Sequence, residues 1–285
     1  MIAPSSPRAL EDAHRHCAAL AREHAHDEWL GALYAGPRER DALLTLAAFD
    51  HEIRQARFRA RDRNLAALRL SWWRGVVAGE RSEEAAGSPV ARALLTAMEN
   101  FALPPALLEA MLDAQLTELA PDRPFNLADF QTFAVESEGA RLKLASRIAA
   151  GGRDLDSVDA CAHAATALAI RRLLASLPFK AGRAPTLFPE DLAGRHAADF
   201  EARRMSDGVG AACAEMLALA RESLDEAERR LEVSAPQILP AFAPLGALRL
   251  DLDRLERNSA TPFEPARPAS PLRRQWAIWR WSHRR

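Results

Sequence analysis

Charged side chains at two places in the chain have the residue types and the spacing that could bind an anionic ligand. Asp50 and Arg54 lie four residues apart, near the end of a largely apolar stretch that covers residues 43–58. A second set with the same spacing consists of Arg172, Ser176 and Lys180. Helical residues at this spacing share one face, and guanidinium and ammonium groups bind phosphate. Each set could therefore form one side of an anion site.

Both sets also have a simpler interpretation. Asp50 and Arg54 could pair only with each other, which on an exposed helix contributes a few tenths of a kcal/mol. Pro178 lies between Ser176 and Lys180 and should end the helix there, because proline in a helix interior costs about 3 kcal/mol. Lys180 would then point into solvent. The sequence leaves both interpretations open.

The helix that carries Asp50 and Arg54 is the element around which the chain is organised. Apolar residues recur every three or four positions at Leu43, Leu46, Phe49 and Ile53, which is typical of a buried helical face. We therefore expect a core helix with one charged, functional end.

Helical periodicity continues along the whole chain. The expected helices cover residues 7–35, 38–58, 65–76, 90–101, 105–119, 127–150, 158–177, 205–233, 236–257 and 270–281. Glycine and proline separate them, and no alternating strand pattern competes with them. The expected fold class is all-α, with residues 1–285 forming a single domain.

Composition excludes several classes of function. The 285 residues carry a formal net charge of −1, whereas a nucleic-acid partner requires a clearly basic face. The three cysteines lie far apart without a metal-binding spacing, as expected for a reducing compartment. Neither a signal peptide nor a membrane-spanning apolar run is evident. These features predict a cytoplasmic protein without a bound metal.

The final segment, residues 270–285, is predicted to be a basic, tryptophan-rich helix. It holds Trp276, Trp279 and Trp281 together with five arginines, among them Arg280. Indole rings and cations together are typical of a segment that lies at a membrane surface. These four residues are candidate membrane contacts, which would place the protein at the inner face of the cytoplasmic membrane. Alternatively, Trp276 and Trp279 could both pack into the core.

Several segments resemble, in order and spacing, those of the squalene/phytoene synthases. These enzymes are head-to-head prenyltransferases with the all-α isoprenoid synthase fold. The segments are Arg38-Glu39-Arg40, Leu70–Arg74, Ser88-Pro89-Val90, Leu127–Phe130, Glu138-Gly139 and Leu187–Leu192. The resemblance implies an isoprenoid-synthase-type helical bundle. It also implies a remnant ligand cavity lined by Asp50, Glu52, Arg54, Arg172, Ser176 and Lys180.

The chain departs from this family where its active members hold metal. Active members carry two aspartate-rich motifs that bind Mg²⁺ and neutralise the diphosphate. The segment that resembles the first motif, Glu52–Phe58, keeps only Glu52 as an acid, and Ala175–Lys180 keeps no carboxylate of the second. The resemblance therefore implies a basic pocket in place of a metal site. We expect no cofactor, with Mg²⁺ required only if the protein is an enzyme.

The pattern of replacements resembles one degenerate branch of the family, whose members assist the assembly of mitochondrial respiratory complex I, and its bacterial relatives. Two stretches carry this second resemblance, namely Ala175–Phe179, which precedes Leu187-Phe188-Pro189, and Phe49–Ile53. It implies a non-catalytic assembly factor with respiratory-complex subunits as partners, or a protein that binds isoprenoids or anionic lipids. The alternative is a prenyltransferase that condenses isoprenoid diphosphates head-to-head, in squalene, phytoene or hopanoid precursor synthesis.

Overall fold

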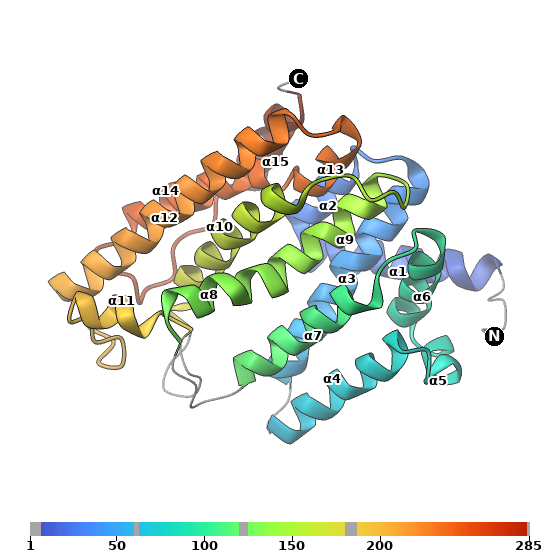
Figure 1. Ribbon diagram of the computed structural model, residues 1–285, viewed down its shortest axis with the longest axis horizontal. Coiled ribbons are helices and arrows are strands. Elements are labelled where there is room, and N and C mark those ends of the chain that lie inside the picture. Colours follow the sequence, from blue (N-terminus) through green and yellow to red (C-terminus); the bar gives the residue numbers. More distant parts are fainter. Residues whose placement is uncertain (1–6, 60–62, 120–124, 180–186, 284–285) are drawn as a thin grey trace.

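The computed structural model describes residues 7–59, 63–119, 125–179 and 187–283, and within these ranges every regular element is a helix (Figure 1). The elements are α1 (Pro7–His24), α2 (His26–Ala32), α3 (Pro37–Arg59), α4 (Arg63–Val77), α5 (Ser82–Ala86), α6 (Pro89–Asn100), α7 (Pro105–Leu119), α8 (Leu127–Ala134), the π-helix η1 (Val135–Gly139), α9 (Ala140–Ala149), α10 (Val158–Ser176), α11 (Glu190–Arg195), α12 (Asp207–Glu232), the 3₁₀-helix η2 (Pro236–Ile238), α13 (Leu239–Phe242), α14 (Leu245–Arg257) and α15 (Pro271–Ser282). The expected all-α fold is confirmed.

Helix α3 is the core helix that the periodicity predicted. Its apolar residues are buried on several sides, from Leu44 and Ala47 to Phe49 and Ile53, because a helix surrounded by others has no solvent face to keep polar. It packs against α1, α2, α4, α6, α7 and α9. Asp50 and Arg54 therefore lie on a helix that is held on most sides.

Helix α10 is the second central element. Small side chains such as Ala164, Ala165 and Ala169 are buried along it, so that its neighbours approach closely. It packs against α12, η1, α14, α8 and α9. Helix α9 packs against both central helices, α3 and α10. Most of the buried apolar residues therefore form one hydrophobic core, and the helices form a single domain.

The structure divides two of the helices expected from the sequence. The expected helix over residues 7–35 breaks at Ala25, whose φ of −135° and ψ of 53° are not helical. The break directs α2 onto α13 and α15, so packing outweighs local propensity. The expected helix over 236–257 becomes η2, α13 and α14, in a segment that contains Pro240 and Pro244.

The third difference lies within the expected helix 127–150. Its start is as expected, since Asn126 caps α8 in a capping box with Asp129. In the middle, however, η1 widens the helix by one residue per turn, which the hydrophobic pattern does not signal. The short helix α5 was also missed.

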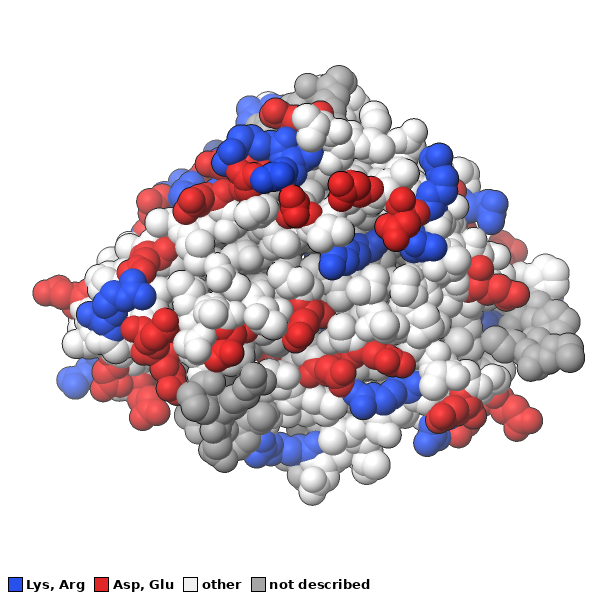
Figure 2. Space-filling view, in the orientation of Figure 1, with Lys and Arg blue, Asp and Glu red and all other residues white. Residues whose placement is uncertain are grey.

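The surface carries charges of both signs. Figure 2 shows blue and red side chains interspersed with uncharged ones on the face seen in Figure 1. Among the described residues, none of the helices is long and apolar enough to cross a membrane. The three cysteines are buried thiols, and burial raises the pKa of each to about 11.

Helix α15 approaches α14 closely at Gly246. A methyl group at this position would lie 2.8 Å from the carbonyl oxygen of Ala277 and 2.9 Å from Cα of Ile278. We predict that Gly246→Ala lowers the free energy of unfolding by about 1–3 kcal/mol, because the backbone of α15 must shift. Gly194→Ala in α11, where a methyl group meets nothing within 4 Å, is the control. Thermal unfolding measures both, and equal stability of the two variants would contradict the prediction.

Candidate functional site

Asp50 and Arg54 form a pair that reaches across the core. Arg54 Nε donates to Asp50 Oδ2 at 2.7 Å along α3, and its Nη2 donates to Glu138 Oε1 at 3.1 Å in η1. Both side chains are less than one-fifth exposed. The local pair expected from the spacing is therefore present, but it is part of a larger set of interactions.

Glu138 is the shared partner of three arginines. Besides Arg54, it accepts a hydrogen bond from Arg141 Nε at 3.1 Å, and its Oε1 lies 3.2 Å from Nη1 of Arg172 in α10. The Glu138 side chain is 7 % exposed. One carboxylate thus links α3, η1, α9 and α10.

Two further carboxylates complete the set. Glu118 of α7 lies 3.3 Å from Arg172 Nη2, and Glu28 of α2 lies 3.6 Å from Arg141 Nη1. We call this set the arginine–carboxylate cluster; its members are Glu28, Asp50, Arg54, Glu118, Glu138, Arg141 and Arg172. Its members come from α2, α3, α7, η1, α9 and α10, so the cluster connects most of the bundle.

The cluster carries no excess of positive charge. Three arginines face four carboxylates, so the excess of positive charge expected from Arg54 and Arg172 is absent among the described members. Lys180 lies outside the described residues. The sequence did bring Arg54 and Arg172 to one place, but it did not reveal that Glu118 and Glu138 lie between and beside them.

Mutual attraction keeps Arg54 and Glu138 charged although they are buried. Burial disfavours the charged form of Arg54, but Asp50 and Glu138 outweigh this effect and raise its pKa. Burial alone would raise the pKa of Glu138, whereas the positive charges of Arg54 and Arg141 lower it to about 2. The central carboxylate is therefore ionised at neutral pH.

The π-helix η1 presents Glu138 to these arginines. A π-turn shifts the side chains that follow it by about one position around the helix, and such segments are frequent at functional sites. Within η1, the Ser137 hydroxyl donates to the Phe133 carbonyl at 2.7 Å. Since η1 packs directly against α10, Glu138 reaches Arg172 as well as Arg54.

A small cavity lies beside the cluster. Ser176 and Arg172 line a cavity of about 30 Å³ with Glu118 and two phenylalanines, enough for about one water molecule. Typical ligand pockets measure about 300–1,000 Å³. Glu52 lies elsewhere, in a hollow of about 320 Å³ between α3 and α4 that includes Arg69 and Trp72. Glu52 and the pair Arg172 and Ser176 therefore line two different hollows.

A divalent cation does not fit the cluster. Asp50, Glu118 and Glu138 each have a guanidinium within 3.3 Å, and a cation would have to compete with these arginines for the oxygen atoms. Within the described ranges, no group of three or more His, Cys, Asp or Glu side chains could hold a metal ion.

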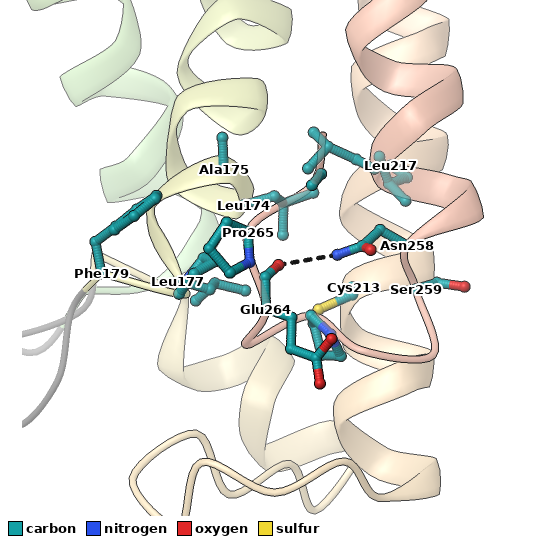
Figure 3. A pocket seen from close by; sticks show the side chains of 14 residues that line it. Leu174, Ala175, Leu177, Phe179, Cys213, Leu217, Asn258, Ser259, Glu264 and Pro265 are labelled. Atoms are coloured by element: carbon teal, nitrogen blue, oxygen red, sulfur yellow. Dashed lines mark hydrogen bonds between the residues drawn. The ribbon is translucent and has the colours of Figure 1, made fainter. Parts of the chain in front are cut away.

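An apolar cavity away from the arginine–carboxylate cluster was not predicted from the sequence. It measures about 210 Å³ and lies between the end of α10, α12 and the segment that follows α14 (Figure 3). Leu174, Leu177 and Leu217 form its walls, and Asn258 Nδ2 donates to the Glu264 carbonyl at 3.0 Å beside it. Phe179, which is 73 % exposed, lies at its rim. This cavity suits a small apolar group.

The candidate membrane contacts are divided between two faces of α15. Trp276 and Trp279 are exposed, and Arg280 lies over the Trp276 ring at 4.7 Å. Trp281 is half-buried and donates from Nε1 to Glu228 at 3.2 Å. The alternative in which Trp276 and Trp279 both pack into the core is thus wrong. Ile278 takes that place.

Most of the chain matches one family of known proteins. The family model described as squalene/phytoene synthase matches residues 21–280. NADH dehydrogenase (ubiquinone) complex I, assembly factor 6 of Homo sapiens is 23 % identical over 269 residues, which cover 93 % of this chain and 80 % of that protein. The rat protein of the same name is 22 % identical over 268 residues, with the same coverage.

Solved structures share the fold. A dehydrosqualene synthase superposes with a TM-score of 0.80 at 14 % identity, covering 96 % of both chains. Squalene synthase HpnC from Alicyclobacillus acidocaldarius superposes with a TM-score of 0.74 at 20 % identity, covering 90 % of this chain and 98 % of the other. At these identities the similarity concerns the fold alone.

Glu138 offers a direct test of the cluster. We predict that Glu138→Gln lowers the free energy of unfolding at pH 7 by about 3–5 kcal/mol, because three buried arginines lose their shared charge partner. Since its pKa falls from 4.5 to about 2 on folding, this contribution is present above pH 4.5 and is lost as the pH falls towards 2. Denaturant unfolding between pH 2 and 7 measures both effects. The matched control is Glu136→Gln on the exposed side of η1; if both variants are equally stable, the cluster does not support the fold.

Proposed function

The chain belongs to the squalene/phytoene synthase family, and on that premise we propose that it is a non-catalytic member that assists the assembly of respiratory complex I. The human and rat relatives named above support this proposal, since both are complex I assembly factors and match 93 % of the chain. Complex I subunits are the partners that the proposal requires.

One observation carries the non-catalytic part of the proposal. Arg54 and Arg172, from the two central helices, both contact Glu138 Oε1, at 3.1 and 3.2 Å. We infer that Glu52–Phe58 and Ala175–Lys180 occupy the positions of the family's two metal-binding motifs. Of the carboxylates that these motifs require, they keep only Glu52. In that case Arg54 and Arg172, instead of Mg²⁺, supply the positive charge that faces the buried carboxylates. Their charges are then already neutralised by protein carboxylates, leaving little attraction for a diphosphate.

A second candidate function is the binding of an isoprenoid or lipid without its transformation. The apolar cavity of about 210 Å³ in Figure 3 favours it, because leucine and proline side chains line it and could hold part of a hydrocarbon chain. Its Cys213 is an inert wall residue, since burial raises the pKa of this thiol to about 11.

The assembly role predicts a defect in living cells. In a bacterium that encodes this chain, we expect deletion of the gene to reduce intact complex I on native gels and NADH oxidation by isolated membranes, with other respiratory complexes unchanged. Expression of the wild type or of Glu136→Gln should restore both. Normal complex I in the deletion strain, after wild-type expression has been confirmed in its parent, would contradict the proposal.

The absence of catalysis predicts the outcome of a turnover assay. We expect no release of diphosphate from farnesyl or geranylgeranyl diphosphate in the presence of Mg²⁺ or Mn²⁺, because the carboxylates of the cluster hold arginines. Product formation that is abolished by Glu52→Ala would establish the prenyltransferase alternative instead. Retention of unreacted farnesol by the wild type but not by Leu217→Trp, which fills the cavity, would support the second candidate.

A further inference from the structure

Helix α15 is attached to the bundle by one face. Arg274 pairs with Asp27 of α2 and with Asp251 of α14, where Nη1 lies 2.5 Å from Oδ1. Four residues on, Ile278 is 1 % exposed, and after three more Trp281 donates to Glu228 of α12. The spacing of four and three residues places these contacts on one side of the helix. The helix is therefore held in a fixed orientation.

The opposite side of α15 presents large apolar side chains to solvent. Leu272, Trp276 and Trp279 repeat the spacing of four and three residues and are 77 %, 56 % and 48 % exposed. We call them the outer row. Tyr34, which is itself exposed, lies against His283 at the end of this row, with ring centroids 5.8 Å apart. The exposed apolar surface thus continues from α15 to the end of α2.

A basic pocket borders the outer row. It measures about 260 Å³ and lies between α14 and the start of α15, where Arg254, Arg257 and Arg273 line it. Its other lining residues are Leu250, Pro268, Ala269 and Ser270. None of its lining residues is acidic. Arg273 directly follows Leu272 of the outer row, so the pocket and the row are contiguous.

The three arginines of this pocket differ from several other arginines on the surface. Arg221, Arg230 and Arg249 each contact two carboxylates, whereas no ion pair is found for the three pocket arginines within the described ranges. Asp251 is the acid that acts on Arg254, but its carboxylate is bound by Arg274. Like charges also act on one another, since Arg257 and Arg274 oppose the charge of Arg254. A cluster of this kind is complementary to an anion.

We propose that this surface binds an anionic phospholipid bilayer, with α15 lying parallel to the membrane. Arg254, Arg257 and Arg273 contact a lipid phosphate, while the outer row enters the boundary between headgroups and acyl chains. Trp276 carries Arg280 over its ring, which places an apolar group and a cation together as this boundary requires. The proposal is independent of any role in complex I assembly.

The charge pattern favours a membrane over a protein partner or a second copy of the chain. The apolar residues form a single row along the helix, and beside it lie cations that have no ion pair among the described residues. The surface is therefore matched to a laterally uniform layer of phosphates above hydrocarbon. A second copy would bring the same cations opposite each other, which is unfavourable.

Vesicle sedimentation of the full-length protein tests the proposal. We expect binding to vesicles of phosphatidylcholine with phosphatidylglycerol at low salt, weak binding to phosphatidylcholine alone, and a decline as salt is added. Arg254→Gln, Arg257→Gln and Arg273→Gln together should weaken binding at least about tenfold. Trp276→Ala with Trp279→Ala should do the same and abolish the blue shift of tryptophan fluorescence on binding.

Matched variants control for charge and for exposed apolar area. The charge control carries Arg8→Gln, Arg69→Gln and Arg204→Gln together, which remove three exposed charges elsewhere. The apolar control carries Leu68→Ala with Val233→Ala, which remove exposed apolar groups from α4 and the end of α12. Each control protein should bind vesicles as the wild type does. Circular dichroism confirms that each variant folds. Equal binding by the pocket variant and its control overturns the proposal. Binding of soluble glycerol phosphate without vesicle binding, or self-association that the tryptophan variants remove, overturns it as well.

Discussion

The fold depends on a buried carboxylate that three arginines share. Glu138 lies at 5 % exposure among Arg54, Arg141 and Arg172, and removal from water would be costly for each of these charges if it were alone. Their mutual attraction offsets this cost, and it connects α3 with η1, α9 and α10. The two central helices are therefore positioned by charge as well as by apolar packing. Such an arrangement constrains the bundle to one register, because a shifted helix would leave a buried charge unpaired.

The sequence predicted the fold class and most helices, because helical periodicity and proline or glycine boundaries are local signals. It failed where packing decides the backbone: the break at Ala25, which no glycine or proline marks, follows from the docking of α2 on α13 and α15. It also could not locate η1, since one extra residue in a turn hardly alters the hydrophobic pattern. The family resemblance placed Arg54 and Arg172 at one site, but it did not reveal Glu138, which is 84 positions from Arg54.

The site combines a synthase-type fold with a charged interior in which arginines pair with carboxylates. Arg172 and Ser176 border a cavity of about 30 Å³ there. The larger apolar cavity lies on another side of α10, formed with α12 and the segment after α14. Helix α10 thus separates a charged interior from an apolar cavity, and a ligand of the second would not contact the arginine–carboxylate cluster.

The ion pair between Asp27 and Arg274 also has a consequence for biosynthesis. These residues are 247 positions apart, and contacts of such long range form late because the chain between them must first be ordered. During translation, Arg274 is still inside the ribosome when α2 and most of the bundle have emerged. The α2 surface therefore stays uncovered until α15 has emerged. Chaperone binding to this uncovered surface would fall within that interval.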